Sequence, residues 1–257
     1  MIAERGADRL ARTAAEVASR WRLMLEPAFR SSCHAYVAPT SAGTVLKVTS
    51  PEDDEADEEA EALELWGGDG AVRLLRHESG SRAMLLERAR PGDDISGLPE
   101  HEATAIAVEV GTRLWRRAGS PFRWIGDHVP RWLDNAERAR GPSAELIPLA
   151  RRMHASLEVG RSCLVHGDLH HHNILATAGG SVAIDPKPML GEREFDVPPF
   201  FWNPIAQRMT LDLAQARLEA FAAAGLDPAK MRAWVVIRGA CLGVDEGDVA
   251  VLRALIS

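Results

Sequence analysis

The hydrophobic pattern at the start of the chain is that of an amphipathic helix. Apolar residues recur every three or four positions between about residues 8 and 25, which places them on one face of a helix. The residues of this stripe are Leu10, Ala14, Val17, Trp21 and Leu25. The pattern therefore predicts a helix with one apolar face and one polar face.

Four short segments after this helix have the composition of β-strands. Residues 34–37 and 44–49 are separated by a turn at 41–43, and residues 71–75 and 83–86 follow further along the chain. The first part of the chain is therefore expected to form a small antiparallel sheet.

The segment between the second and third of these strands is predicted to be a helix that runs from Ser50 to about Trp66. Ser50 can cap the helix, Pro51 suits its first turn, and Asp53 stands where a capping box places an acid. Gly67 follows Trp66 and is expected to end the helix.

A break in the pattern at Arg90-Pro91-Gly92 predicts a boundary between two lobes, residues 1–90 and 91–257. Beyond it the chain becomes mainly helical, apart from short strands around residues 163–184. The first helices of this part are expected at 100–117, 130–138 and 143–157. The fold class predicted is α+β, with a small N-terminal antiparallel-sheet lobe and a larger, mainly helical C-terminal lobe.

Charge and composition narrow the classes of partner. The 257 residues include 37 acidic and 30 basic side chains, which give a net charge of −7. Nucleic acids and anionic membranes are bound by basic surfaces, so neither is an expected partner, whereas a cationic small molecule is compatible. No obligate protein partner is indicated. Three cysteines without a CxxC pair, no apolar leader and no run long enough to span a bilayer predict a cytoplasmic protein.

The segment most informative about chemistry is LVHGDLHHHN, residues 164–173, followed by VAIDPK at 182–187. Phosphoryl transfer to an alcohol needs a carboxylate that orients the hydroxyl and takes its proton. It also needs oxygen ligands for the Mg²⁺ on the phosphates of ATP, and a lysine near those phosphates. Asp168 and Asn173 have the interval of a kinase catalytic loop, and a predicted hairpin brings Asp185 back beside them. The set predicts Asp168 as catalytic base, with Asn173 and Asp185 as metal and nucleotide ligands.

These motifs resemble the aminoglycoside phosphotransferase family, and within it the branch of streptomycin 6-phosphotransferases and hydroxyurea kinases. TVLKV, WGGDGAVRLL, MLLERARPG and DVPPFFWNP resemble the same branch, so the likeness extends from about Pro27 to Pro204. It implies a protein-kinase-like fold with a nucleotide-binding first lobe, and a second lobe for catalysis and acceptor binding. It also implies ATP as donor, Mg²⁺ as metal and a small acceptor with a hydroxyl group. A streptomycin-type aminoglycoside is the favoured acceptor, and hydroxyurea or another small metabolite is the alternative.

Lys47 stands in an otherwise apolar strand, on the face opposite its immediate neighbours. A buried lysine needs a partner of opposite charge, and a nucleotide phosphate together with a helix carboxylate would provide it. Glu59 lies on the inward face of the helix that follows and is the acid that best matches the family pattern. Glu55 and Glu58 remain alternatives.

The resemblance also assigns the adenine and phosphate contacts. It implies that the backbone carbonyl of Glu87 and the backbone N–H of Ala89 bind the adenine. No glycine-rich GxGxxG stands near the first strands, where residues 30–34 read Arg-Ser-Ser-Cys-His. Serine hydroxyls and backbone N–H groups of this segment are expected to cover the phosphates instead.

Three further residues are expected to support the site. His166 precedes Asp168 by two residues, as in the His-Arg-Asp pattern of kinases, and is expected to hold the loop backbone. The family pattern places Asp196 where it bonds the same backbone. Lys187 either contacts a phosphate or the acceptor, or forms an ion pair with Asp185 or Asp196.

Several residues of the second lobe are candidates for binding the acceptor. Trp202 could line its pocket, and acidic side chains could bind a guanidinium or amine group. These acids are Glu192, Glu194, Asp245, Glu246 and Asp248. The alternative is that they form an ordinary solvated acidic surface.

Three other functions compete with this interpretation. The run His170, His171 and His172 could be part of a transition-metal site, although adjacent histidines do not easily face one ion, and the last two are expected to be partly exposed. A non-catalytic pseudokinase would bind nucleotide without turnover, but the residues expected for catalysis are all present. A protein kinase is disfavoured because no Ala-Pro-Glu-like segment follows Asp185.

Overall fold

The chain folds into two compact units in a computed structural model, which describes residues 2–29, 34–205 and 207–256. The first unit comprises Met1–Asp93 and Leu175–Lys187, and the second comprises Asp94–Ile174 and Pro188–Ser257. A sheet dominates the first unit and helices dominate the second, which confirms the predicted fold class. Among the residues described, no helix is both long enough and apolar enough to cross a membrane.

The first unit is built on a four-stranded antiparallel sheet with strand order β1-β2-β4-β3. Its strands are β1 (Ala35–Pro39), β2 (Thr44–Thr49), β3 (Leu74–Glu78) and β4 (Ala83–Glu87). The segment before β1 runs along its free edge, since Glu26 N donates to Pro39 O at 2.8 Å and Phe29 N donates to Val37 O at 3.0 Å. All four predicted strands are present, with ends displaced by up to three residues.

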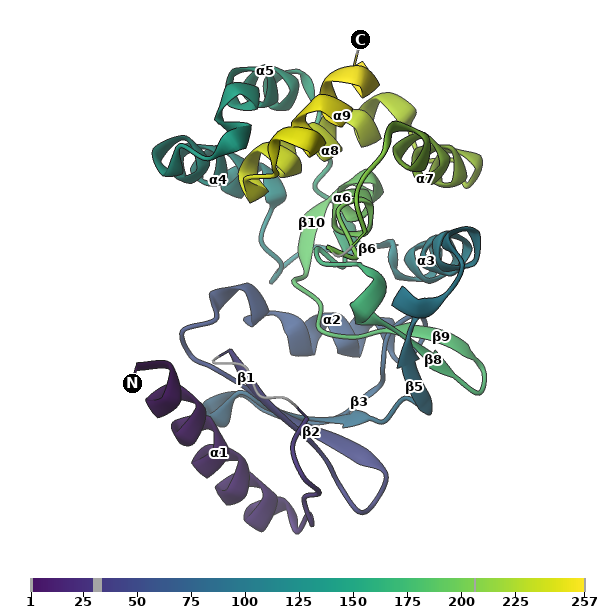
Figure 1. The fold of residues 1–257 in the computed structure, drawn as a ribbon. Coiled ribbons are helices and arrows are strands. Elements are labelled where there is room, and N and C mark those ends of the chain that lie inside the picture. Colours follow the sequence, from purple (N-terminus) through teal and green to yellow (C-terminus); the bar gives the residue numbers. More distant parts are fainter. Residues whose placement is uncertain (1, 30–33, 206, 257) are drawn as a thin grey trace. The chain divides into compact units, whose positions relative to one another are not determined.

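Helices α1 (Ile2–Trp21) and α2 (Glu59–Trp66) cover the two faces of this sheet (Figure 1). The apolar stripe of α1 packs against Leu46 and Val48 of β2 in one buried cluster. Because side chains alternate along a strand, Lys47 between them faces α2. The two helices therefore give β2 an apolar face and a face on which a charge can be paired.

Several predicted helix boundaries are wrong. In the second unit, the helix predicted at 100–117 ends at Leu114, the one predicted to begin at 130 begins at Ile125, and the one predicted to begin at 143 begins at Ile147. Two errors in the first unit have a clear local cause. The first helix ends at Trp21 instead of Leu25, because Arg22 has a φ of 57° and Leu25 pairs with Thr40 as a β-bridge. The second helix does not begin at Ser50. A 3-10 turn at Asp54–Ala56 precedes it, and α2 begins at Glu59. The Ser50 hydroxyl bonds the side chain of Glu52, so the predicted capping box does not form. The end of this helix is predicted correctly, with Gly67 at a φ of 58°.

A hairpin from late in the sequence completes the first unit. Strands β8 (Ile174–Thr177) and β9 (Gly180–Ala183) form a second sheet with β5 (Pro91–Asp94), in the order β5-β8-β9. Ala183 is bonded to the loop before β3, since its N–H donates to Gly70 O at 2.8 Å and its carbonyl accepts from Val72 N at 3.0 Å. Residues 175–187 thus belong to the first unit, whereas the sequence division placed all residues after 90 in the second lobe.

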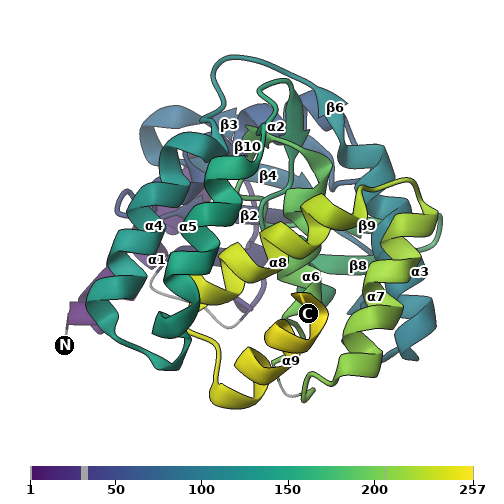
Figure 2. The same ribbon diagram turned by 90° about the horizontal axis from the view of Figure 1, so that it is seen from above.

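Helix α8 (Pro228–Leu242) is the centre of the second unit. It packs against α4, α5, α6, α7 and α9 (Figure 2). Eight of its residues are buried, Trp234 among them. Asp227 caps it, accepting from Ala229 N at 2.7 Å. The surrounding helices are α3 (Glu100–Leu114), α4 (Ile125–Ala139), α5 (Ile147–Ser156), α6 (Val197–Phe201), α7 (Leu211–Ala223) and α9 (Glu246–Ile256). A small sheet with order β10-β7-β6 lies beside them, formed by β6 (Arg116–Arg117), β7 (Cys163–Val165) and β10 (Met189–Gly191).

Candidate phosphotransfer site

Lys47 is held between two carboxylates inside the first unit. Its Nζ lies 2.6 and 2.7 Å from the two oxygens of Glu59 on α2, and 2.6 Å from Oδ1 of Asp185 after β9. The exposed fractions of Lys47 and Glu59 are only 5% and 1%. Burial alone would lower the pKa of Lys47, but the two carboxylates outweigh it, and the pKa is raised above its usual value. The ammonium group is therefore a permanent positive charge on this face of the sheet.

Asp185 reaches Lys47 through an unusual backbone conformation. Its φ is 55°, in the left-handed region that residues with a side chain seldom occupy. Such a conformation costs on the order of 1–3 kcal/mol and persists where surrounding contacts enforce it. The Asp185 side chain remains 44% exposed although one oxygen bonds Lys47. An accessible carboxylate of this kind fits the oxygen donors that Mg²⁺ prefers.

In the second unit, a buried carboxylate holds the loop that carries Asp168. Asp196 accepts hydrogen bonds from His166 N at 2.9 Å, Gly167 N at 2.7 Å and Trp115 Nε1 at 2.8 Å. Burial outweighs these bonds and raises the pKa of Asp196 to about 6. The backbone contacts are those expected for Asp196. Trp115 was not identified from the sequence, where nothing distinguishes it from the other tryptophans.

Two further contacts fix Asp168 within this loop. Nδ1 of His166 accepts from the Asp168 N–H at 3.2 Å, which is the role in holding the backbone expected for that histidine. Asn173 Nδ2 donates to the Asp168 carbonyl at 3.0 Å and lies 3.3 Å from its Oδ2. Because the amide nitrogen of Asn173 faces Asp168, its amide oxygen is the atom that suits a hard cation. The loop from Asp168 to Asn173 is therefore closed by hydrogen bonds between its two ends.

The three consecutive histidines point in different directions. His172 bonds Asp94 at 2.9 Å, and His170 accepts from the backbone N–H of His172 at 3.2 Å. His171 is 2% exposed and stacks on Phe200 with ring centroids 4.0 Å apart, so the expectation that it is partly exposed is wrong. Among the described residues, no group of three or more histidine, cysteine or acidic side chains could hold a metal ion. The transition-metal alternative therefore gains no support.

The other candidates for contacting the nucleotide are Lys187, Glu87, Ala89 and residues 30–33. Lys187 pairs with Asp53 at 3.2 Å, not with Asp185 or Asp196, because Asp53 is not used in the helix cap that the sequence predicted for it. Glu87 ends β4, and its N–H donates to Arg73 O at 2.9 Å. The adenine contacts of Glu87 and Ala89 stay predictions. Of the expected phosphate loop, residues 30–33 lie outside the described residues.

Glu192 and Glu194 are not solvated acids. Glu192 accepts from Trp234 Nε1 at 2.6 Å and also pairs with Lys230, while Glu194 accepts from Asp227 N at 3.0 Å. Both are buried within the second unit. These contacts bind the start of α8, and they are the physical reason why neither carboxylate is available to an acceptor here. Trp202 is half-buried against Gly239 of α8.

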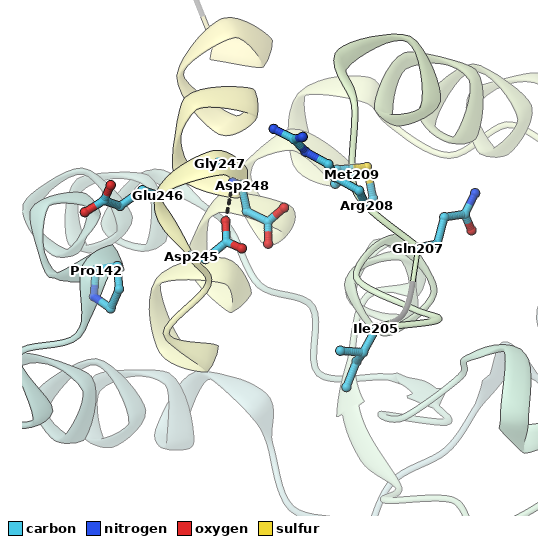
Figure 3. A pocket seen from close by; sticks show the side chains of 9 residues that line it. All are labelled: Pro142, Ile205, Gln207, Arg208, Met209, Asp245, Glu246, Gly247 and Asp248. Carbon is cyan, nitrogen blue, oxygen red and sulfur yellow. Dashed lines mark hydrogen bonds between the residues drawn. The ribbon is translucent and has the colours of Figure 1, made fainter.

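The other acidic candidates border a pocket of about 650 Å³ in the second unit (Figure 3). Asp245, Glu246 and Asp248 lie on one side, at the start of α9, and Arg208 lies on the other. Asp245 also caps α9, since its Oδ1 accepts from Asp248 N at 2.9 Å. Burial and the neighbouring Asp245 raise the pKa of Asp248. Apolar side chains of Pro142, Ile205 and Met209 complete the lining.

Comparison with known families identifies the chain. A family model described as aminoglycoside/hydroxyurea antibiotic resistance kinase matches residues 21–249. The chain belongs to this family. The sequence-based prediction of a phosphotransferase is thereby confirmed, together with the resemblance on which it partly rested.

The relatives of this kinase include enzymes named for two different classes of compound, streptomycin and hydroxyurea. A streptomycin 3''-kinase of Klebsiella pneumoniae is 32% identical over 236 residues, covering 84% of this chain and 86% of its own length. A hydroxyurea phosphotransferase of Kitasatospora aureofaciens is 32% identical and covers 92% and 74%. A streptomycin 6-kinase of Streptomyces glaucescens is 31% identical and covers 94% and 85%.

The fold of the kinase is also similar to that of solved enzymes. The aminoglycoside phosphotransferase APH(4)-Ia, in a ternary complex with ADP and hygromycin B, matches with a TM-score of 0.61 at 16% identity. The match covers 94% of both chains. Similarity at this level of identity supports the kinase-like fold alone.

The Lys47–Glu59 pair should contribute strongly to stability. Glu59→Gln should lower the free energy of unfolding by about 1–3 kcal/mol, because it leaves a buried ammonium with only Asp185 as partner. Adding Lys47→Met should recover part of this loss, since no unpaired buried charge then remains. Urea unfolding of the single and double variants measures the coupling. The exposed Arg88–Glu26 pair is the control, with coupling below about 1 kcal/mol. Purely additive losses at Lys47 and Glu59 would contradict the expectation.

His171 should make the kinase sensitive to acid. Burial is the main cause that lowers its pKa to about 4, so the unfolded chain takes up the proton near pH 6.5 while the folded chain does not. The contribution of His171 to the free energy of unfolding is therefore fully present above pH 6.5 and is lost as the pH drops toward 4, by about 2 kcal/mol at pH 5. Asp196, whose pKa is raised, contributes in the opposite direction over the same range, so the slope due to His171 is the difference between the wild-type protein and the His171 variant. His171→Phe should remove this slope in urea unfolding without metal or nucleotide. His101→Gln should retain it, because the His101 side chain is 84% exposed. An unchanged slope in His171→Phe would refute the assignment.

Proposed function

We propose that this kinase transfers the γ-phosphate of ATP to a hydroxyl group of a streptomycin-type aminoglycoside. The observation that carries the proposal is the pairing of Asp168 with Asn173 in one loop, in a chain where Lys47 is also bonded to both Glu59 and Asp185. These are the residue types that phosphoryl transfer needs, and each group is fixed by contacts inside its own unit.

Each residue then has a distinct role. Asp168 orients the acceptor hydroxyl and takes its proton as the oxygen attacks the γ-phosphorus. Lys47 neutralises the phosphates of the donor, and Glu59 holds the ammonium group in place. The backbone of Glu87 and Ala89 binds the adenine. Asn173 and Asp185 would hold Mg²⁺, which supplies charge neutralisation on the phosphates when bound.

We assign the acceptor to the pocket at the start of α9, which lies in the same unit as Asp168 and would favour a large cationic compound over a small neutral one. Its volume of about 650 Å³ is in the range of sites that enclose drug-sized ligands. Hydroxyurea would leave most of it empty. The carboxylates of Asp245, Glu246 and Asp248 would attract the guanidinium groups of streptomycin. Two of the relatives described above are streptomycin kinases, which supports the same choice.

Hydroxyurea is the second candidate acceptor. The hydroxyurea phosphotransferase of Kitasatospora aureofaciens matches this chain about as well as the streptomycin kinases do. Identity alone therefore does not separate the two acceptors, and a direct assay is needed.

Turnover should depend on Asp168 and on an alcohol acceptor. With Mg-ATP, the wild-type protein should release ADP in the presence of streptomycin and form a phosphate monoester that mass spectrometry detects. Asp168→Asn should lower kcat by about 10²–10⁴ while leaving the affinity for ATP nearly unchanged, because the amide cannot take the proton. Hydroxyurea, neutral sugars and choline-like alcohols are the comparison acceptors.

The outcomes of this assay separate the candidate functions. ADP release with hydroxyurea but not streptomycin would replace the aminoglycoside by the second candidate. Nucleotide binding without turnover on any acceptor would indicate a pseudokinase. Retained turnover in pure Asp168→Asn protein would contradict the role of Asp168.

Metal-dependent nucleotide binding should require the carboxylate of Asp185. Asp185→Asn removes the charge but keeps a residue type that tolerates a positive φ, so the backbone is preserved. Wild-type protein should bind ADP more tightly with Mg²⁺ than with EDTA, and Asp185→Asn should lose most of this difference. Isothermal titration calorimetry measures both. An equal effect of Mg²⁺ in the variant would show that the metal is held elsewhere.

A further inference from the structure

His170 is the histidine of the catalytic loop that lies beside Asp168. Its Nε2 is 3.7 Å from Oδ2 of Asp168, and its side chain is only 17% exposed. Asn173 Nδ2 lies 3.3 Å from the same Asp168 oxygen. The carboxylate of Asp168 is therefore flanked on one oxygen by two nitrogen atoms from the same loop.

The other ring nitrogen of His170 has a different task. His170 caps the 3-10 turn at His171–Asn173, with Nδ1 accepting from His172 N at 3.2 Å. A nitrogen that accepts a backbone hydrogen bond carries no proton, so the neutral ring has its proton on Nε2. Because Nδ1 accepts the cap hydrogen bond, the ring nitrogen that faces Asp168 is a protonated Nε2.

A distance of 3.7 Å is longer than a hydrogen bond, but it still allows an electrostatic attraction between an N–H dipole and a carboxylate. The interaction favours the Asp168 rotamer in which Oδ2 lies between the two nitrogen atoms. It also restrains Asp168 when it receives the proton of the acceptor, because a fixed carboxylate needs no reorganisation in the transition state.

We propose that His170 is a positioning residue for Asp168, acting through its Nε2–H. The inference rests on the proposed function, in which the acceptor O–H bond breaks, its proton passes to Asp168, and the new O–P bond replaces the bond between the γ-phosphorus and ADP. His170 neither gives nor takes a proton in this sequence. Its two ring nitrogens have separate tasks, with Nδ1 holding the turn and Nε2 holding the base.

Two substitutions separate these tasks. The amide oxygen of Asn occupies nearly the position of Nδ1, and Asn is a good cap residue, but its side chain is too short to reach Asp168. The amide nitrogen of Gln occupies nearly the position of Nε2 and can donate there, but Gln is a poor cap. His170→Asn therefore keeps the turn and removes the donor to Asp168, whereas His170→Gln does the reverse.

The test is steady-state kinetics with Mg-ATP and whichever of streptomycin or hydroxyurea the wild-type protein phosphorylates, together with thermal unfolding. His170→Asn should lower kcat about tenfold, with KM for ATP and for the acceptor changed less than about twofold. His170→Gln should retain most of kcat although its unfolding temperature is lower. His101→Gln is the control, because the His101 side chain is 84% exposed and belongs to α3, outside the loop that carries Asp168.

The opposite result would overturn the inference. If His170→Asn has the wild-type kcat and His170→Gln does not, the residue acts only as a cap. Equal losses in both variants, or a loss confined to KM, would also contradict a role through Nε2. Asp168→Asn, measured in parallel, separates the role of His170 from the role of Asp168 itself. If turnover depends on Asp168 but not on the donor of His170, only the inference fails. If there is no turnover, or none that depends on Asp168, both fail.

Discussion

A lysine ammonium group with almost no access to water is the constraint on which the first unit depends. Removing such a charge from water costs several kcal/mol, and only close opposite charges offset that cost. Glu59 and Asp185 supply them from a helix and from a hairpin more than a hundred residues later in the chain. The sheet, α2 and the hairpin must therefore come together for the charge of Lys47 to be tolerated. The positive φ of Asp185 is part of the same arrangement, because it directs the carboxylate at the ammonium group.

In the second unit the buried charge is negative, and it is the carboxylate of Asp196. Asp196 has no exposed surface, and its carboxylate accepts three N–H groups, two of them from the backbone of the catalytic loop. Its raised pKa means that part of the cost of burial remains, so the carboxylate is held at the expense of stability. In return, the hydrogen bonds of Asp196 fix the backbone of His166 and Gly167, immediately before Asp168. In both units, a buried charge determines the position of a less buried group that is suited to chemistry.

The parts of the site that could be predicted are those that local sequence determines. Alternation along β2 was enough to place Lys47 on the face opposite Leu46. Helical spacing together with the family resemblance favoured Glu59, but Glu55 and Glu58 stayed open until the fold showed which carboxylate contacts Lys47. The partner of Lys187 was not predictable, because Asp53 has the sequence of a helix cap and only the folded chain shows that the cap is absent. His171 was misjudged for a similar reason. A polar run predicts exposure, whereas its stacking on Phe200 depends on a helix that begins 26 residues later.

Residues that act on the ATP donor are easier to predict from the sequence than residues that bind the acceptor. Asp168, Asn173 and Asp185 lie within one short stretch of the sequence, because a loop and a hairpin of fixed length set their spacing. The pocket at the start of α9, which we propose as the acceptor site, is lined from three distant parts of the chain, and none of them has a recognisable pattern. These parts are Pro142, then Ile205 with Gln207–Met209, and Asp245–Asp248. Glu192 and Glu194 are acids of the same kind, but their carboxylates are hydrogen-bonded to Trp234 within α8 and to Asp227 at its start. Acidity alone is thus a poor guide to an acceptor site. The informative property is a carboxylate that borders a cavity and is not already neutralised by its own fold, and that property emerges only when distant segments are packed together.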